Sequence, residues 1–208
     1  MDTHKMNTAL MNTLEITDVP WHRLTTPYGR GTDLPHLISN EEYAAIADLI
    51  EHQGTLWQVT PWALLFLLRN MHARRPEDIT LSELELYHTV VQALDIENLQ
   101  ADSQESVESL TMLLDEKYLW PADSDPEEDE LEWEEEEARG YDPVAFWSYY
   151  DWSCRLLKQA LPDFESLLQH YADSEIAESL SELVQQLRKN FKYKKTNQIK
   201  KTGDISSK

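Results

Sequence analysis

The side chains that most often perform chemistry are few and poorly spaced in this sequence. No two of its seven histidines lie four residues apart, so no predicted helix presents a pair of zinc ligands on one face. The single cysteine, Cys154, follows Trp152 in an aromatic segment, where a buried and inert thiol is expected. The five glycines form no G-x-S-x-G elbow, phosphate-binding loop or dinucleotide fingerprint. These patterns predict no nucleophilic catalysis, no cofactor and no metal site.

Carboxylates are the one abundant reactive group, with 39 Asp and Glu against 18 Lys and Arg. Their number does not predict catalysis, because catalytic carboxyls need surroundings that shift their pKa, and a sequence does not show those. The stretch from Asp123 resembles an oxygen-rich calcium loop. However, Glu128 stands where such a loop requires glycine, and Pro126 interrupts it. We therefore predict that the protein is not an enzyme.

The densest acidic segment runs from Asp123 to Glu137 and contains eleven acidic residues and no basic one. Such a run is usually a solvated loop that keeps a protein soluble. The interleaved Trp133 suggests a recognition surface instead, in which charge steers a basic partner and the aromatic ring slows its dissociation. The same ring could equally pack on the core of the protein itself. The candidate partner-binding residues are Asp123, Asp125, Glu127, Glu128, Asp129, Glu130, Glu132, Trp133, Glu134, Glu135, Glu136 and Glu137.

Charge is unevenly distributed along the 208 residues, whose net charge is -21. Residues 188–208 contain eight basic residues and one acidic residue, which leaves a charge of -28 on residues 1–187. A surface this acidic repels nucleic acid and anionic membranes, both of which bind through positive charge. The expected partner is therefore a basic protein.

Hydrophobic periodicity and capping signals predict helices along most of the chain. Ser39 and Glu42 fit a capping box that would open the first helix, and Gly54 would end it. The next helix would begin after Thr60. It is apolar on nearly all sides, which predicts a central position in the fold.

Five further helix starts are predicted from capping residues or first-turn prolines. They lie at Thr80, with Glu83 completing a capping box, at Asp102, at Asp142–Pro143, at Pro162 and at Asp173 or Ser174. No convincing pair of strands is predicted. From Lys192 the sequence predicts a basic tail that frays at the end of the chain.

Together these elements predict an all-α fold of about seven helices in antiparallel pairs. One helix begins about every twenty residues, which is the spacing of HEAT-type arrays. The domain would span residues 20–191, with a polar segment at 1–19, an acidic loop at 121–141 and a flexible tail at 192–208. The longest apolar run, residues 63–68, is too short to span a membrane, and no secretory signal is visible, so a cytoplasmic protein is expected.

Two segments in the first third resemble a group of bacterial HEAT-like helical proteins. The first reads Pro-Trp-His-Arg-Leu and then Tyr-Gly-Arg-Gly-Thr-Asp-Leu-Pro-His-Leu-Ile, over residues 20–38. The second reads His-Gln-Gly-Thr-Leu-Trp-Gln-Val-Thr-Pro-Trp, over residues 52–62, and leads into an apolar helix. Departures from the family pattern are Gly31 for alanine, Trp57 for tyrosine and a single Thr-Pro at Thr60.

The resemblance implies an α-α array, and such families include immunity proteins of bacterial toxin systems. It carries over no catalytic residue. The matched positions are expected to be mainly structural: the glycines would permit turns, Asp33 would cap a turn, and His52 with Gln53 would satisfy loop carbonyls. The motif residues are Trp21, Tyr28, Gly29, Asp33, Pro35, His52, Gln53, Gly54 and Thr55.

The leading hypothesis is an immunity or antitoxin-like protein that binds a cognate basic toxin domain and blocks its active site. The first alternative is a helical scaffold that binds a protein or peptide unrelated to toxins. The second is an enzyme that uses carboxylates gathered from different helices. A pocket of converging carboxyls with shifted pKa values would favour that last alternative.

Overall fold

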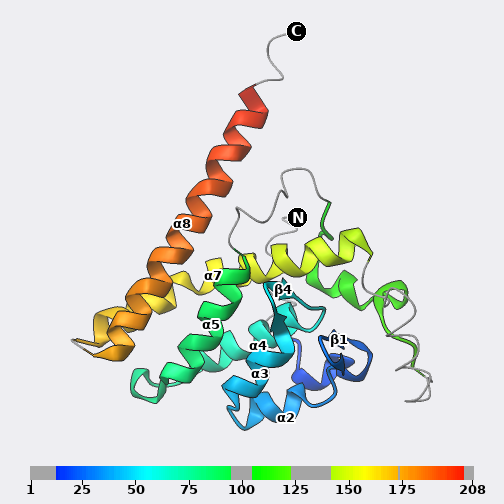
Figure 1. Cartoon of the computed structure of the whole chain (residues 1–208), viewed down its shortest axis with the longest axis horizontal. Coiled ribbons are helices and arrows are strands. Elements are labelled where there is room, and N and C mark those ends of the chain that lie inside the picture. Colours follow the sequence, from blue (N-terminus) through cyan, green and yellow to red (C-terminus); the bar gives the residue numbers. More distant parts are fainter. Residues whose placement is uncertain (1–12, 95–104, 123–141, 173, 204–208) are drawn as a thin grey trace.

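The computed structural model describes residues 13–94, 105–122, 142–172 and 174–203, and for residues 191–203 it describes the backbone alone (Figure 1). The predicted all-α class is confirmed. The α-helices lying wholly within the described residues are α2 (Leu34–Ser39), α3 (Tyr43–Ile50), α4 (Thr60–Ala73), α5 (Leu81–Ala93), α7 (Pro143–His170) and α8 (Glu175–Gly203). Short 3-10 turns are η1 (Ile16–Asp18), η2 (Trp21–Arg23), η3 (Pro76–Asp78), η4 (Leu110–Leu114) and η5 (Glu116–Tyr118).

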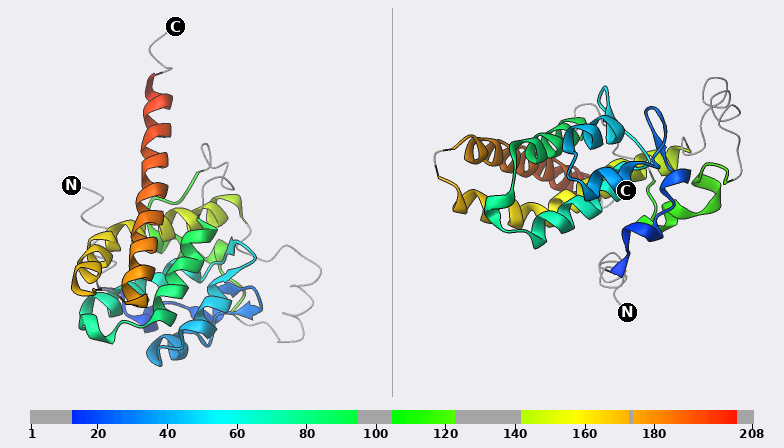
Figure 2. Two further views of the ribbon diagram at one scale, coloured as in Figure 1. Left: turned by 60° about the vertical axis from the view of Figure 1, so that its left-hand side comes forward. Right: turned by 90° about the horizontal axis from the view of Figure 1, so that it is seen from below.

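Helix α4 forms the centre of the core, as its apolar sequence predicted. Every residue from 61 to 68 is buried, and the helix packs along α7. Helix α8 packs on both α5 and α7, while α3 packs on α5 and α2 packs on α3 and α4 (Figures 1 and 2). Tyr87 of α5 and Phe164 of α7 meet edge to face, with ring centroids 5.3 Å apart, and both are fully buried. Apolar burial on this scale is the main term that stabilises such a fold.

Several predicted helix starts are confirmed. Helix α4 begins at Thr60 with Pro61 in its first turn and ends before Arg74. The Thr80 hydroxyl accepts a hydrogen bond from the Glu83 N–H, and the Asp142 carboxylate accepts two from the first turn of α7. In each case the side chain satisfies backbone donors that a helix leaves unpaired at its N-terminus. Ser174 does the same for α8.

The helix predicted between Ser39 and Gly54 is wrong in both its boundaries. Ser39 ends α2, and α3 begins after Glu42, which makes no side-chain cap. Glu41, with a φ of 57°, occupies the left-handed region and breaks the helical path between the two. Gly54, with a φ of 81°, lies in a hairpin turn beyond α3 rather than at a helix end.

The chain also forms two small antiparallel hairpins where no strand pair was predicted. Strand β1 (Thr25–Thr26) pairs with β2 (Gly29–Arg30), and β3 (Glu51–His52) pairs with β4 (Thr55–Leu56). Thr25 lies opposite Arg30, and Glu51 lies opposite Leu56. Strands of two residues are too short to show the alternating pattern that identifies a strand. The turn residues, Gln53–Gly54 above all, were the available signal, since both have positive φ as a two-residue hairpin turn requires.

The α-helix predicted from Asp102 to Tyr118 is wrong for residues 105–122, which form η4 and η5 instead, while Asp102 lies outside the described residues. Backbone groups of this segment bind other elements and so cannot form a helical ladder. The Val107 N–H donates to the Ser148 hydroxyl of α7, and the Trp120 N–H donates to the Arg23 carbonyl. Val107, Leu110, Leu113 and Tyr118 of the segment are still buried in the core.

Pro162 does not start a helix but lies inside the single long helix α7. It sits on the exposed side, where the carbonyl that loses its hydrogen bond can be hydrated.

Helix α8 continues to Gly203, past the predicted start of the tail at Lys192. Cys154 is buried, as expected. None of the helices within the described ranges is long and apolar enough to cross a membrane.

The two matched segments are packed so closely at Gly31 that a larger side chain there should be destabilising. A Cβ atom at this position would lie 2.6 Å from the Val59 Cγ1 atom and 3.2 Å from the Trp21 carbonyl oxygen. We expect Gly31→Ala to lower the free energy of unfolding by about 1–3 kcal/mol, as overpacking does. Urea denaturation measures this. Val59→Ala in the same chain should recover part of the loss, and a fully additive double variant would contradict the contact.

Candidate functional site

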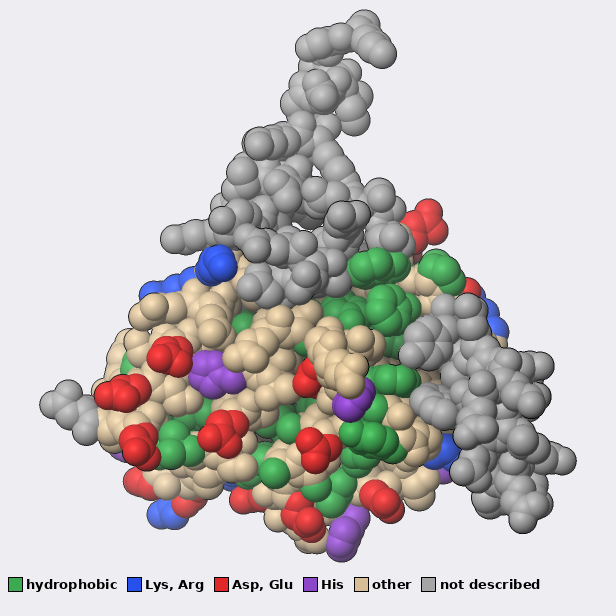
Figure 3. Space-filling view, in the orientation of Figure 1, with side chains coloured by type: hydrophobic (Ala, Val, Ile, Leu, Met, Phe, Trp, Pro, Cys, Tyr) green, Lys and Arg blue, Asp and Glu red, His purple; other side chains and the backbone are tan. Residues whose placement is uncertain are grey.

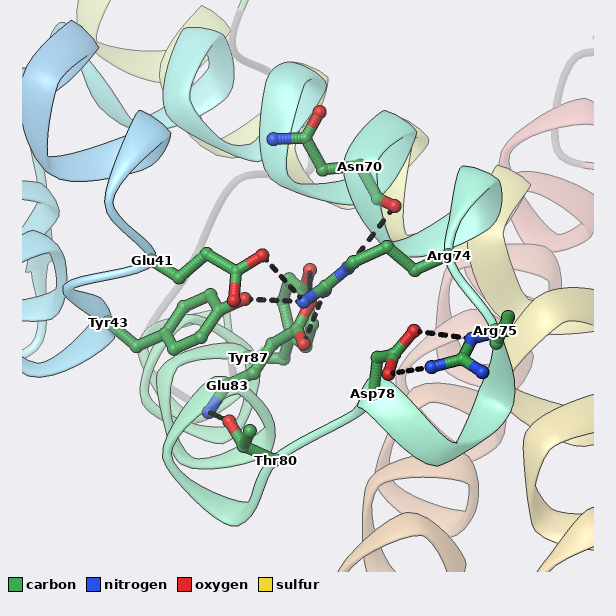
Figure 4. Close-up of polar contacts among 9 residues, drawn as sticks. All are labelled: Glu41, Tyr43, Asn70, Arg74, Arg75, Asp78, Thr80, Glu83 and Tyr87. Carbon is green, nitrogen blue, oxygen red and sulfur yellow. Dashed lines mark hydrogen bonds and ion pairs between the residues drawn. The ribbon is translucent and has the colours of Figure 1, made fainter.

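Residues Arg74, Glu83, Tyr43, Tyr87 and Glu41 form a polar cluster between α3 and α5 at the end of α4 (Figure 4). The Glu83 side chain is completely buried, and Arg74 Nη2 donates to both of its oxygens at 2.5 Å. The Tyr87 hydroxyl donates to the same carboxylate at 3.1 Å. Arg74 Nη1 donates to the Tyr43 hydroxyl at 2.8 Å and to Glu41 at 3.2 Å.

Glu83 therefore does not complete the capping box predicted with Thr80. Its backbone N–H binds Thr80 as expected, but its carboxylate turns inward to Arg74 rather than back to the helix start. A buried carboxylate needs a charged or hydrogen-bonding partner, and Arg74 supplies both charge and donated hydrogen bonds through its Nη2 atom.

Burial dominates the electrostatics of this cluster. It raises the pKa of the Glu83 carboxyl, while the hydrogen bonds and charge of Arg74 oppose the rise. Burial, and then the charge of Glu83, raises the pKa of Tyr43 to about 12 and that of Tyr87 well above its usual value. Burial lowers the pKa of Arg74, but its hydrogen bond and ion pair with Glu83 outweigh this effect. A carboxyl with a raised pKa can indicate an active site. Here the carboxylate is sealed from solvent and held by three elements, so the cluster is a structural joint.

No group of three His, Cys, Asp or Glu side chains that could hold a metal ion occurs within the described ranges. The raised pKa of Glu83 belongs to the buried joint, so it does not supply the open pocket of converging carboxyls that the enzymatic alternative requires.

The two segments that carry the family resemblance lie against each other. The Thr25 N–H donates to the Gln58 side chain at 3.0 Å, and Gln58 donates to the Tyr118 carbonyl at 2.7 Å. At the hairpin tips, the Tyr28 ring meets the His52 ring edge to face at 5.6 Å, and the Tyr28 hydroxyl lies 3.3 Å from His52 Nδ1. Both tips project from the same edge of the body (Figure 2, right). The motif thus builds one surface from residues 24 positions apart.

An aromatic ridge, formed by Tyr28, His52, Phe146 and Trp147 around the buried Tyr150, extends from the hairpin tips onto α7. The Tyr150 hydroxyl accepts a hydrogen bond from the Leu56 N–H at 3.1 Å and so fastens β4 to α7. The Tyr150 ring lies 5.2 Å from that of Phe146 and 6.0 Å from that of Trp147, both half-buried. Tyr28 is 66% exposed, the largest value for a big apolar side chain within the described ranges.

Beside this ridge lies an acidic α2–α3 face, defined by Asp33, Glu41, Glu42, Asp48 and Glu51. The sequence from residue 31 to residue 68 contains these five acids and neither Lys nor Arg. Asp33, Glu42 and Asp48 are exposed and form no ion pair with the described basic residues. In Figure 3 acidic side chains are scattered over the visible face beside a band of hydrophobic ones, while Lys and Arg lie toward its margins.

The arginines between residues 13 and 94 are all bound by groups of the protein itself. Arg23 pairs with Glu116, Arg74 with Glu83 and Arg75 with Asp78. Arg30 donates to the His22 and Pro121 carbonyls, and Arg69 donates to the Leu14 carbonyl. Four of the five therefore hold separate segments together, and only Arg75 keeps a largely exposed side chain, paired with Asp78.

The structure describes some of the predicted site residues but not others. The acidic run at 123–137, with Trp133, lies outside the described residues. Trp21 is buried and donates to the Ile16 carbonyl, Pro35 lies in the first turn of α2, and Thr55 lies opposite His52. These positions agree with structural roles.

Two of the expected motif roles are wrong. The Asp33 side chain makes no capping hydrogen bond, and His52 meets the Tyr28 ring and hydroxyl rather than a loop carbonyl. The positive φ angles of Gly29 and Gly54 confirm that these two residues permit turns, and Gln53 shares the left-handed conformation in the second hairpin.

Phe146 and Trp147 lie in the helix predicted from Asp142–Pro143, and neither was singled out from the sequence as a surface residue. The surface position of Trp147 could have been recognised from its place in the helical repeat. It lies on the side of α7 that continues through Asp151, Arg155 and Lys158, opposite the buried stripe.

Comparison of the chain with protein-family models, curated proteins and solved structures gave no match.

The buried ion pair should contribute far more to stability than an exposed pair close by in the chain. We expect Arg74→Met to lower the free energy of unfolding by about 3 kcal/mol or more, because it leaves the buried Glu83 charge without a partner. Combining it with Glu83→Leu should recover much of the loss. Arg75→Met breaks the exposed pair with Asp78 and is the matched control, for which little change is expected. Equal effects of Arg74→Met and Arg75→Met would contradict this assignment.

Stability should also fall at alkaline pH. The folded-state pKa of Tyr43, about 12, lies above its ordinary value of 10.0. The protonated hydroxyl therefore contributes stability that is constant below pH 10 and is lost as the pH rises from 10 to 12. Urea midpoints across this range measure the decline, which Tyr43→Phe should make shallower. An unchanged profile in the Phe variant would show that Tyr43 is not the group involved.

Proposed function

We propose that this chain is an immunity protein, similar to an antitoxin, that binds a basic bacterial toxin domain and blocks its active site. The observation that carries the proposal is the distribution of charge. The acidic α2–α3 face has five carboxylates and neither Lys nor Arg in its sequence, while four of the five arginines of residues 13–94 bind distant segments of the protein itself. The family resemblance of residues 20–70 supports the same class of function.

The mechanism we propose is the replacement of an anionic substrate by protein carboxylates. An enzyme that acts on nucleic acid or another polyanion needs a cationic cleft. A surface with a charge of -28 over residues 1–187 would accelerate the encounter with such a cleft. Carboxylates of the acidic face would then occupy the positions of the substrate phosphates, while the aromatic ridge would supply apolar contact area.

Within this proposal the helices form a short HEAT-like array that serves as a rigid support. The connections between α2 and α3 and between α7 and α8 are short, and the helices of each pair are in contact. A scaffold that binds a protein unrelated to toxins would use the same surface, so a functional assay has to separate the two.

The deciding experiment isolates the partner and tests protection. The chain is used as bait in its native host, and captured proteins are identified by mass spectrometry. We expect a basic protein that is toxic when expressed alone and harmless when co-expressed with this chain. An acidic partner, or a basic one whose toxicity persists on co-expression, would refute the proposal. A harmless basic partner would favour the scaffold.

Charge and aromatic contact should act on different rate constants of this complex. Neutralising Asp33, Glu42 and Asp48 to Asn or Gln should lower the association rate constant and flatten its dependence on salt. Tyr28→Ala should instead raise the dissociation rate constant, about tenfold to a hundredfold if Tyr28 is a hot spot. Surface plasmon resonance across a salt series measures both.

Two variants serve as controls. Met112→Ala removes the other exposed large apolar side chain, 40% exposed, and should leave the kinetics unchanged. Replacing Glu134, Glu135, Glu136 and Glu137 with Gln tests the acidic run in the same assay. If only this second variant slows association, the contact lies in the acidic run and not on the acidic α2–α3 face.

A further inference from the structure

Helix α8 changes character after Asn190. Its first part buries Leu180, Leu183 and Leu187 against α5 and α7 at helical spacing. Continuing this spacing leads to Phe191 and then to lysines. Residues 192–203, here called the α8 extension, contain five lysines and no acidic residue: Lys192, Lys194, Lys195, Lys200 and Lys201.

The α8 extension leaves the body of its own chain. Figure 1 and the left view of Figure 2 show the helix running outward beyond α5 and α7. Its backbone is helical to Gly203, so at 1.5 Å per residue the extension reaches about 18 Å. Charges separated by more than about 8 Å are largely screened at physiological salt. The outer turns therefore lie beyond the reach of most carboxylates of the same molecule.

The surface complementary to this basic helix is present on the chain itself. The acidic α2–α3 face lies at the opposite end of the body from the tip of the α8 extension (Figure 1). One molecule cannot bring the two together, whereas two molecules can. We propose that the α8 extension of one copy docks on the acidic α2–α3 face of a second copy.

Charge also argues against other binding partners for the α8 extension. Two extensions would repel each other, and past Phe191 the sequence offers no apolar seam for a coiled coil. A nucleic acid would meet the repulsion of the -28 carried by residues 1–187. Because face and extension are different surfaces at opposite ends, the contact is heterologous, and association should grow with concentration.

The proposal does not depend on a toxin partner, so it can fail while the proposed function stands. Sedimentation velocity of the full chain over a wide concentration range, at an ionic strength of about 0.15 M, tests it. We expect the mean mass to rise with concentration and the rise to disappear at high salt.

A charge swap identifies the surfaces. A variant of the α8 extension should weaken self-association roughly tenfold or more. It carries Lys192→Glu, Lys194→Glu and Lys195→Glu and is called the tail variant. Face variant Asp33→Lys, Glu42→Lys and Asp48→Lys should do the same. An equimolar mixture of the two should associate again, because each supplies the charge that the other has lost. Circular dichroism checks that both variants fold.

The matched control is Glu77→Lys, Glu105→Lys and Glu178→Lys, which changes net charge by the same amount on exposed positions elsewhere. It should associate as the unmodified chain does. A monomeric unmodified chain at all concentrations would overturn the proposal, as would a mixture that fails to associate or a control that loses association like the face variant. Binding of a random-sequence DNA duplex by an otherwise monomeric chain would assign the extension to nucleic acid instead.

Discussion

The excess of acidic over basic residues is the constraint on which the surface of this protein depends. With 39 acidic and 18 basic residues, the chain cannot neutralise its carboxylates. Residues 13–94 contain five arginines, and four of them join segments that are far apart in the sequence. Arg74 is the clearest case, since it satisfies a fully buried carboxylate and so joins α3, α4 and α5. Carboxylates remain on the surface because acidic residues outnumber basic ones, and the internal contacts of the arginines leave few cations to pair with them.

The same constraint connects the fold to the candidate surface. The hairpins are anchored from within, by Gln58 between β1 and η5 and by the Tyr150 hydroxyl under β4. Their tips are free to present Tyr28 beside His52, and residues 31–51, which include α2 and α3, contain five acids and neither Lys nor Arg. A rigid aromatic ridge beside unpaired negative charge suits the capture of a cationic surface, because charge accelerates encounter and buried rings slow release.

Much of the helical framework could be predicted from local signals. Three helix starts could be read from the sequence: the apolar run after Thr60, the Thr80 cap and the Asp142–Pro143 pair. The capping side chains mark a start because they satisfy the backbone N–H groups that a helix leaves unpaired at its N-terminus. Predictions failed where tertiary contacts decided the outcome. Residues 105–122 bind the Ser148 hydroxyl and the Arg23 carbonyl in place of a helical ladder, and α7 tolerates Pro162 because that position faces solvent. Glu83 fits a capping box in sequence, but only the fold reveals Arg74 beside it. The contact between Tyr28 and His52 likewise could not be predicted from the sequence alone, because the two residues lie 24 positions apart.

The central claim is that this chain neutralises a basic enzyme by occupying the place of its anionic substrate. The most direct measurement is the activity of the captured partner on its substrate, over a matrix of substrate concentrations and concentrations of this chain. Inhibition at one-to-one stoichiometry that excess substrate relieves is the predicted result. A chain that binds its partner but leaves that activity intact, or inhibits it equally at every substrate concentration, would contradict the account.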